Sequence, residues 1–526
     1  MKQSPLRSVL ILLCCLLLLH PVQAQMSSKQ IDQLVENALT RFNVAGAAVG
    51  IVKDGRIIHA KGYGVRSVEN QTPVDAHTNF DIASNTKAFT TAALAMLVEE
   101  GRLSWQDKVV THLPEFKMYD PWVTAHFTIV DLLTHRSGLG LGAGDLTIFP
   151  DGSDFTMQDI VSIFQHFQPV SEFRTKYDYD NLLYMVAGEV IKRVSGLSWE
   201  DFVQTRILDV IGMDRSFSTL IGHEASENLA TPHFDDAGTL KPTAHDTFDP
   251  SRINGAAGAI VSNVDDLCQW MLLHLNHGKY GKAQSETLFS ERSQKKMWRI
   301  HTVLNASRNP RYNAHFAGYG LGWRLTDVKG NLSVSHTGGL TGMLSKTLMI
   351  PDLNLGVVVL TNTWMGGASL FSAVSQTLVD SYLGLDDFDW VESLGQRSDR
   401  AEAGADSVVT AVWKTVKAAE DRPVEFGNFV GNYRDAWFGQ ITISIQDDRL
   451  WFASRRSPKL NGPMHFYKAN TFAIQWVNRE MDADAFASFT LDEEGRAQAI
   501  RMKGISPDID FSYDFQDLDL RRVKTE

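Results

Sequence analysis

Strand-forming segments at both ends of the first 385 residues, separated by helices, constrain the fold of this chain more than any other feature. Residues 47–58 have the pattern of two strands joined by a turn at Asp54-Gly55. Residues 334–360 return to strand, and the turn-forming run 351–354 divides them. Helical patches and loops fill most of 105–300. This order predicts an α+β domain: one antiparallel sheet assembled from the two ends, flanked by helices, with an all-helical region.

The remainder of the chain predicts a second, smaller domain, because 526 residues exceed one ordinary domain. Residues 386–422 are polar and charged, which predicts a linker with a short helix at 407–419. Beyond it the pattern is nearly all strand, and residues 441–445 alternate between apolar and polar side chains. We therefore expect a main domain at 25–385, a linker, and a small β-barrel or sandwich at 423–526.

The first 24 residues have the pattern of a secretory signal peptide. Lys2 and Arg7 precede an apolar run at 9–19, and Ala24 ends a small-residue cleavage site. The run is shorter than the roughly 20 apolar residues that span a bilayer, and no later stretch is long and apolar enough. We expect removal of residues 1–24 and export, either to the periplasm or out of the cell, without a membrane span.

Charge, cysteine and histidine usage exclude several classes of function. A net charge of −12 and a pI near 5.7 argue against a general nucleic-acid binder, which needs a basic face. Only Cys268 remains after the leader, so an internal disulfide is excluded, and its amphipathic helical context predicts a core residue. The histidines lack the spacing of metal ligands, and no phosphate-binding glycine loop occurs. We therefore expect neither a metal nor another cofactor.

Ser84 and Lys87 lie three residues apart at the expected start of a helix, which places both side chains on one face. A Ser hydroxyl is a weak nucleophile until a base takes its proton, and a Lys amine of lowered pKa can be that base. The helix N-terminus adds free backbone N–H groups for an oxyanion. A bare Ser-x-x-Lys is a weak signal, since residues 293–296 repeat it in a very polar stretch. Ser84 differs because it lies between a strand-like segment and a strongly apolar helix.

Two further motifs carry groups that suit the same chemistry. Tyr179-Asp180-Asn181 offers a hydroxyl for proton transfer and an amide that can hold both a Lys and a substrate amide oxygen. His336-Thr337-Gly338-Gly339 lies on an expected strand, where glycines let a substrate approach the strand edge and a free N–H can complete an oxyanion hole. Taken alone, the first also fits a hydrogen-bonded surface loop, and the second an ordinary tight turn.

The three motifs in this order resemble those of the serine β-lactamase and penicillin-binding protein superfamily. The closest pattern is the class C β-lactamase-like branch, which also contains esterases and D-aminopeptidases. The resemblance covers residues 30–385, and residues 426–524 are similar to the lipocalin-like barrel often appended to such hydrolases. Four further segments match the branch: Leu132 to Leu139, Ile211 to Met213, Gly255 to Gly258, and Tyr319 to Trp323.

The resemblance implies a role for the residues of the first two motifs. Ser84 would be the acylated nucleophile, Lys87 its base and Tyr179 a proton shuttle. Asn181 would orient the substrate. The implied reaction is a ping-pong acyl transfer in which water releases the acyl group.

The third motif departs from the family pattern, because His336-Thr337-Gly338 stands where the family has Lys-Thr-Gly. The backbone N–H groups of Ser84 and Gly339 would form the oxyanion hole. A Lys is a permanent cation suited to a β-lactam carboxylate, whereas His336 is expected to be only partly charged near neutral pH. We place His336 with the catalytic groups, and Thr337, Gly338 and Gly339 with the substrate-binding ones.

The His in the third motif is similar to that of the D-aminopeptidase members, so the resemblance implies a serine hydrolase of small peptides or amides, including those with a D-residue, or of esters. Two alternatives stay open: a class C-type β-lactamase that tolerates the His, and a slowly acylating penicillin-binding or sensing protein. For the β-domain, a small-molecule binding module is an alternative to a structural cap or an assembly surface. The expected partner is a small molecule or short peptide, and homo-oligomerisation is left open.

Overall fold

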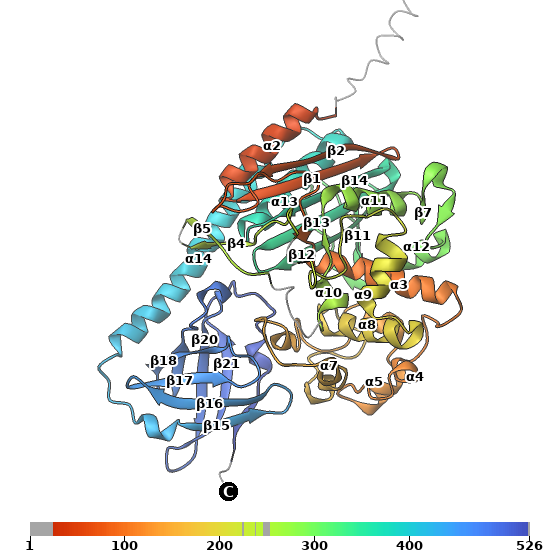
Figure 1. The fold of residues 1–526 in the computed structure, drawn as a ribbon. Helices are drawn as coiled ribbons and strands as arrows, with labels where there is room; N and C mark the ends of the chain where they lie inside the picture. Colours follow the sequence, from red (N-terminus) through yellow and green to blue (C-terminus); the bar gives the residue numbers. More distant parts are fainter. Residues whose placement is uncertain (1–24, 224–225, 237, 246–252, 524–526) are drawn as a thin grey trace, which may run out of the picture.

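The computed structural model describes residues 25–223, 226–236, 238–245 and 253–523. The predicted signal peptide therefore lies outside the described residues. The described chain forms a large mixed body and a small barrel, joined by a long helix (Figure 1). Strands from both ends of the large body enter one sheet, which confirms the predicted α+β class.

The sheet of the large body has eight antiparallel strands in the order β2-β1-β14-β13-β12-β11-β10-β9. The first and last segments of the domain meet where β1 pairs with β14, as in the pair Ala48 and Leu360. The two predicted turns lie where the sequence placed them, between β1 and β2 and between β13 and β14. The strands are β1 (Gly46–Lys53), β2 (Arg56–Gly64), β9 (Thr302–Leu304), β10 (Ala317–Tyr319), β11 (Arg324–Val328), β12 (Asn331–Leu340), β13 (Met343–Ile350) and β14 (Leu355–Thr361).

Alternating side chains of β1 enter two separate cores, because successive residues of a strand point to opposite faces. Val49 and Ile51 pack in a core with α2 (Ser28–Arg41) and α13 (Gly366–Leu383). Ala48 and Val52 belong to the larger core on the other face, with α11 (Val264–Leu275) and the helical region. Both faces of the sheet are thus covered, which explains why β1 is apolar along nearly its whole length.

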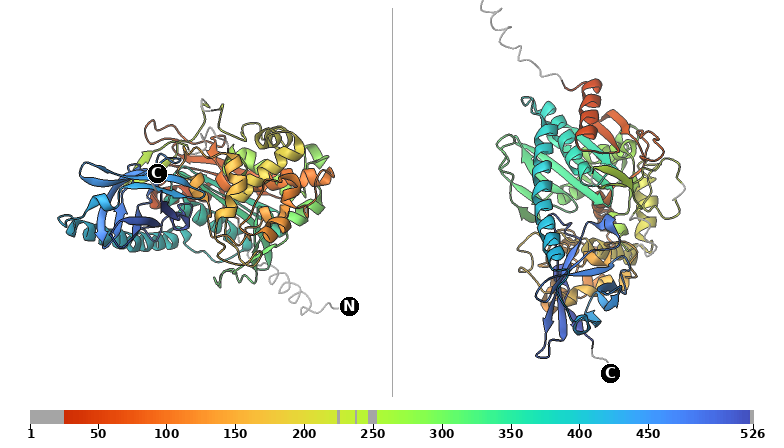
Figure 2. Two further views of the ribbon diagram at one scale, coloured as in Figure 1. Left: turned by 90° about the horizontal axis from the view of Figure 1, so that it is seen from below. Right: turned by 90° about the vertical axis from the view of Figure 1, so that its left-hand side faces the viewer.

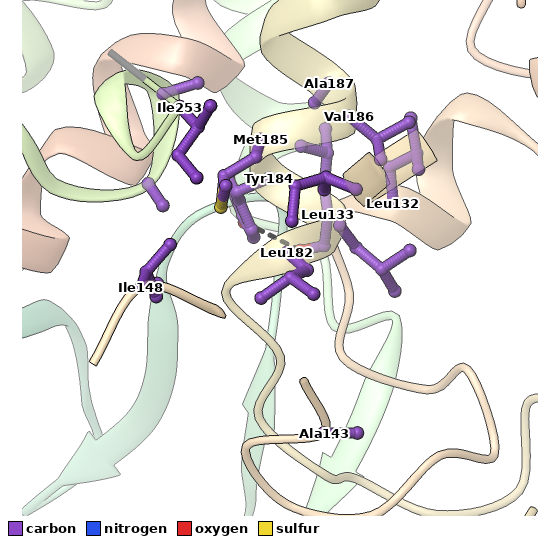
Figure 3. Close-up of a cluster of buried hydrophobic side chains, with 14 of the residues drawn as sticks. Leu132, Leu133, Ala143, Ile148, Leu182, Tyr184, Met185, Val186, Ala187 and Ile253 are labelled. Carbon is purple, nitrogen blue, oxygen red and sulfur yellow. Dashed lines mark hydrogen bonds between the residues drawn. The ribbon is translucent and has the colours of Figure 1, made fainter. Parts of the chain in front are cut away.

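The helical region is organised around α3 (Thr86–Glu99) and α8 (Leu182–Ser195). Figure 3 shows the apolar cluster at the start of α8, where the Tyr184 hydroxyl donates a hydrogen bond of 2.8 Å to Leu133 O. The other helices are α4 (Val109–His112), α5 (Pro121–His126), α6 (Ile129–Leu132), α7 (Met157–Ile163), α9 (Trp199–Val203), α10 (Gly255–Gly258) and α12 (Glu291–Met297). Three small two-stranded sheets pair β3 (Phe80–Asp81) with β6 (Val261–Ser262), β4 (His233–Asp236) with β5 (Thr239–Pro242), and β7 (Lys279–Tyr280) with β8 (Glu286–Thr287).

The segment predicted as a linker with a short helix is one helix of 29 residues, α14 (Trp390–Ala418). Asp389 caps it by accepting a hydrogen bond from Glu392 N at 2.9 Å. Val412 and Val416 near its end are buried in a small core with residues of the barrel. Figure 2 (right) shows the helix running along the side of both bodies. Its stability depends on these tertiary contacts, which the polar sequence does not reveal.

The C-terminal body is a closed barrel of eight antiparallel strands, so the predicted barrel is confirmed. Phe472 contacts Phe429 and Phe489 edge-on, with ring centroids 5.0 and 5.7 Å apart. Aromatic side chains therefore fill the core of the barrel, as expected if this domain has a structural role. The strands are β15 (Gly431–Asp435), β16 (Gly439–Gln446), β17 (Arg449–Ser454), β18 (Asn461–Lys468), β19 (Thr471–Ile474), β20 (Ala485–Leu491), β21 (Ala497–Gly504) and β22 (Leu520–Arg522).

Charged contacts join the barrel to the helical region of the large body. The Arg456 guanidinium pairs with Asp154 at 2.6 Å and with Asp159 at 2.9 Å. It also lies over the Phe155 ring, 3.8 Å from the centroid. Lys459 pairs with Asp151 at 2.6 Å. The two bodies therefore share an interface in addition to the connecting helix.

Candidate active site

Ser84 lies on a tight turn between β3 and α3, in the 3-10 segment Ala83–Asn85. Ala83 has a φ of +49°, in the left-handed region that residues with a side chain rarely adopt. A Cβ on Gly338 of β12 would lie 2.2 Å from Ile82 O and 2.9 Å from Ser84 N. Only glycine therefore lets β12 pass so close to the turn. Ser84 is half-buried and lines a cavity.

Lys87 lies in the first turn of α3, and its side chain is fully buried. Its Nζ is 3.0 Å from Ser84 Oγ, 2.7 Å from Asn181 Oδ1 and 2.9 Å from Ala257 O. The last two oxygens can only accept hydrogen bonds. When the amine is neutral, its two N–H groups donate to these two oxygens. The nitrogen lone pair is then left to accept from the Ser84 hydroxyl. The geometry thus suits proton transfer from Ser84 to Lys87.

Burial lowers the pKa of Lys87 to about 7, although Asp145 and Asp180 act in the opposite direction. Desolvation disfavours the ammonium form, so a substantial fraction of the amine is neutral at neutral pH. A base with a pKa near the working pH combines availability with proton affinity. A Lys needs a lowered pKa to act as the base, and burial rather than a neighbouring cation lowers it here.

Tyr179 is buried beside both groups, with its ring centroid 4.9 Å from Lys87 Nζ. Burial raises its pKa well above the ordinary value, and an interaction with the Ser84 hydroxyl offsets this only in part. The phenol is therefore neutral, and its hydroxyl can donate one hydrogen bond while it accepts another, as a proton relay requires. The His135 ring, 4.2 Å away between centroids, packs against it.

Asn181 connects Lys87 to a buried carboxyl group. Its Oδ1 accepts from Lys87, and its Nδ2 donates to Asp145 Oδ2 at 2.8 Å. Asp145 is fully buried, and burial raises its pKa well above the usual range. One N–H of the Asn181 amide remains for a substrate, so the predicted orienting role is chemically feasible. The sequence did not identify Asp145, because it lies in a loop with no motif of its own.

His336 is neutral, which corrects the expectation that it carries a partial charge. Its Nδ1 lies 2.6 Å from Thr337 O, which can only accept, so Nδ1 carries the hydrogen. Its Nε2 then accepts a hydrogen bond of 2.8 Å from the Tyr319 hydroxyl. Burial lowers the pKa of His336 to about 3, with Lys87 and Arg324 acting in the same direction. His336 therefore cannot replace the charge of a lysine at this position.

The structure brings all eight predicted residues together around Ser84. Lys87 lies within hydrogen-bond distance of its hydroxyl, and Gly338 packs against its turn. The others line the same cavity: Ser84, Tyr179, Asn181, His336, Thr337 and Gly339. Their individual roles remain predictions.

Arg324, at the start of β11, is a further residue of the site that the sequence did not identify. It lines the cavity, and its Nη2 donates to the Tyr177 hydroxyl at 3.1 Å. Within the described part of the chain, no carboxylate forms an ion pair with it. It is paired across the sheet with Ser335, next to His336. A cation is therefore present beside the motif in which the lysine is missing.

The cavity has a volume of about 1040 Å³ and is lined by both bodies and by α14. The described residues that line the cavity include eight carboxylates and two guanidinium groups. One of these cations, Arg41, pairs with Asp399 at 2.8 Å. The carboxylates are Asp178, Asp235, Asp399, Glu402, Glu480, Asp482, Asp508 and Asp510. The cavity is thus strongly acidic, apart from the position of Arg324.

Two kinds of feature are absent from the described residues. No group of three or more His, Cys, Asp or Glu side chains there is arranged to hold a metal ion. None of the helices in the described ranges is both long and apolar enough to cross a bilayer.

Known proteins similar to this chain include hydrolases and penicillin-binding protein homologues. Unguisins hydrolase ungD' of Aspergillus campestris is 27% identical over 440 residues, which cover 81% of this chain and 79% of that protein. Protein flp of Staphylococcus aureus (strain MW2) is 28% identical over 354 residues, 64% of this chain and 63% of its own.

Solved structures show the same fold. The octameric penicillin-binding protein homologue from Pyrococcus abyssi aligns with a TM-score of 0.59 and 21% identity, over 94% of this chain and all of that one. A class C beta lactamase from Rhodobacter sphaeroides aligns with a TM-score of 0.52 and 19% identity, over 67% of this chain and 99% of that one.

Family models cover both bodies of the chain. Residues 416–522 match DUF3471, a domain of unknown function. Residues 31–373, well over half of the chain, match the Beta-lactamase model, and the chain therefore belongs to the Beta-lactamase family.

Proposed function

We propose that this protein is a serine hydrolase that forms an acyl-enzyme at Ser84 and acts on small peptides or amides, with simple esters as side substrates. The observation that carries the proposal is the arrangement at Lys87, whose two fixed acceptors leave its lone pair for Ser84. A buried amine with a pKa near 7 beside a Ser hydroxyl has the properties of a general base.

The proposed reaction has two halves. Ser84 Oγ attacks the substrate carbonyl carbon while its proton passes to Lys87 Nζ. The tetrahedral oxyanion is held by the backbone N–H groups of Ser84 and Gly339. Tyr179 passes its hydroxyl proton to the leaving amine while it takes up the proton from Lys87, and the amide bond breaks. Water then attacks the ester of Ser84 with the same groups acting in reverse, and the acid is released.

The charges of the cavity support a peptide that carries both an amine and a carboxylate. Its volume of about 1040 Å³ is sufficient for a short peptide. The carboxylates of the lining favour a cationic group, and Arg324 offers a bidentate partner for a carboxylate. A D-residue next to the scissile bond remains part of the proposal.

The test is hydrolysis of paired D- and L-aminoacyl p-nitroanilides, with nitrocefin in parallel. Cleavage of the D-series supports the proposal. Rapid turnover of nitrocefin alone identifies a β-lactamase, and a stable adduct without turnover identifies a slowly acylating binding protein. The neutral state of His336 removes the cation that the family's Lys-Thr-Gly supplies, so binding of a β-lactam carboxylate would depend on Arg324.

Export and self-association are also part of the proposal. Residues 1–24 retain the charge and apolar pattern of a signal peptide. The octameric state of the Pyrococcus abyssi homologue makes a homo-oligomer the first assembly to test, by light scattering of the purified protein.

The rate should depend on pH through Lys87. We expect kcat/KM to be level above a midpoint near pH 7 and to fall about tenfold per pH unit well below it, because the protonated amine has no lone pair for the Ser84 proton. Asp180, whose own pKa burial raises to about 7, favours the protonated form of Lys87, so Asp180→Asn should move the midpoint to lower pH and remove the second group that titrates in this range. A profile that rises as the pH falls would contradict Lys87 as the base.

Arg324→Ala should weaken the binding of substrates that carry a carboxylate. We expect KM to rise roughly tenfold with kcat little changed, because the arginine contacts a group remote from the reacting bond. The matched control is the same peptide with its carboxylate converted to an amide, for which the variant and the parent protein should have equal KM. An equal loss on both peptides would show that Arg324 acts on the reaction centre instead.

A further inference from the structure

The barrel supplies a buried carboxylate to the loop that holds the catalytic lysine in place. Asp514, 370 residues from its partner in sequence, accepts hydrogen bonds through Oδ2 from Gly144 N and through Oδ1 from Leu146 N, both at 2.8 Å. Its side chain is fully buried. Both oxygens are thus used on two backbone N–H groups of the other body.

The residue between those two N–H groups is Asp145. Its carboxyl accepts from Asn181 Nδ2 at 2.8 Å, and Asn181 Oδ1 in turn accepts from Lys87 at 2.7 Å. Lys87 Nζ is 3.0 Å from Ser84 Oγ. The barrel is therefore connected to the nucleophile by a continuous series of hydrogen bonds, together with the backbone of Asp145.

Neighbouring residues of the same barrel segment touch the site directly. The Phe511 ring packs edge-on against Tyr179, with centroids 5.9 Å apart and planes at 82°. A Cβ on Gly142, whose N–H donates to Tyr179 O, would lie 2.6 Å from Phe511 O. The Ser512 side chain interacts with the Asp145 carboxyl. The contact between barrel and loop is therefore continuous from 511 to 514.

We propose that Asp514 is a positioning residue for Lys87, and that the barrel completes the active site rather than binding a ligand of its own. The inference deepens the proposed function and rests on it, since it assigns Lys87 as the base. A carboxylate is suited to this position because it can accept from both N–H groups, whereas an amide has one acceptor oxygen and alanine has none. Burial raises the pKa of Asp514 well above its usual range, and Asp517 and Asp145 act in the same direction, so the two accepted hydrogen bonds rather than the charge account for an aspartate here.

The matched control is Asp435, a buried carboxylate on β15 that accepts from Trp437 N, Phe438 N and Asp519 N, all within the barrel. Replacing it removes the same kind of interaction without reaching the catalytic loop. It therefore separates an effect on the stability of the barrel from an effect on the position of Lys87.

The test is the hydrolysis of p-nitrophenyl acetate by the full chain with Asp514→Ala, Asp514→Asn or Asp435→Asn. This ester is too small to depend on the remote walls of the cavity, so its kcat reports on the catalytic groups. We expect kcat to fall about 10- to 100-fold for Asp514→Ala and less for Asp514→Asn, with KM within about twofold. Asp435→Asn should keep the parental kcat at temperatures where it is folded, as checked by circular dichroism.

Equal kcat in the parent and both Asp514 variants would overturn the inference, as would an equal loss in Asp435→Asn. If Asp514→Ala does not fold, the comparison of Asp514→Asn with Asp435→Asn decides. Ser84→Ala in the same assay distinguishes failure of the proposed function from failure of the inference about Asp514. If Ser84→Ala retains activity, both fail. If it is inactive while the Asp514 variants are unaffected, only the inference fails.

Discussion

Ser84→Ala is expected to abolish turnover, with kcat lower by at least ~10⁴-fold on both a p-nitroanilide and an ester, because no acyl-enzyme can form. The loss should leave the fold intact, since Ser84 is half-buried and, among the described residues, its hydroxyl interacts with the catalytic groups Lys87 and Tyr179. Steady-state kinetics give the loss. Mass spectrometry after treatment with a fluorophosphonate should show an adduct on the parent protein and none on the variant.

The chain provides its own control in the second Ser-x-x-Lys, at residues 293–296. Ser293, in the first turn of α12, donates its hydroxyl to Glu99, and it lies outside the lining of the cavity. Ser293→Ala should therefore retain turnover within about twofold, although it loses the hydrogen bond to Glu99, because its backbone N–H still donates to the N-cap residue Ser290. Unaltered activity in Ser84→Ala would eliminate the acyl-enzyme mechanism.

The sheet could be predicted from local strand and turn patterns, whereas the clustering of the three motifs was expected from their resemblance to one family. Strand segments at both ends of the domain predict one sheet, and the pairing of β1 with β14 is seen in the structure. The motif at Ser84 was distinguished from its copy at Ser293 by the apolar helix that follows it. That helix, α3, is buried along nearly its whole length.

Residues whose function depends on contacts between distant segments were not predictable in this way. Asp145, in a single 3-10 turn, joins the Lys87 network through Asn181, and the docked barrel brings Asp514 to the backbone on either side of Asp145. Arg324 reaches the site through the pairing of β11 with β12. A single sequence contains no signal for such contacts.

The prediction of a partial charge on His336 was wrong for a related reason. The ordinary pKa of histidine suggests partial charge near neutral pH. Complete burial, a Tyr319 hydroxyl on one nitrogen and a carbonyl oxygen on the other hold it neutral. Environment, rather than residue type, sets the protonation state.

Lys87→Met should lower kcat by roughly 10²- to 10⁴-fold, the range expected for the loss of a general base. Methionine fills a similar volume without an amine, so the expected loss reflects proton transfer rather than a cavity. The residual rate should also lose its titration near pH 7, because the group responsible for it is absent. Rates from pH 5 to 9 measure both effects.

Lys346→Met is the control for this second prediction, because Lys346 on β13 is another lysine whose pKa burial lowers, to about 8. It lies over the Phe371 ring, on the face of the sheet covered by α13, and does not line the cavity. Its replacement should leave both kcat and the midpoint near pH 7 unchanged. If Lys346→Met moved that midpoint while Lys87→Met kept it, the titration would belong to Lys346, and Lys87 would not be the titrating base. Loss of rate at Lys87 alone, together with loss of the midpoint, would assign both to the amine beside Ser84.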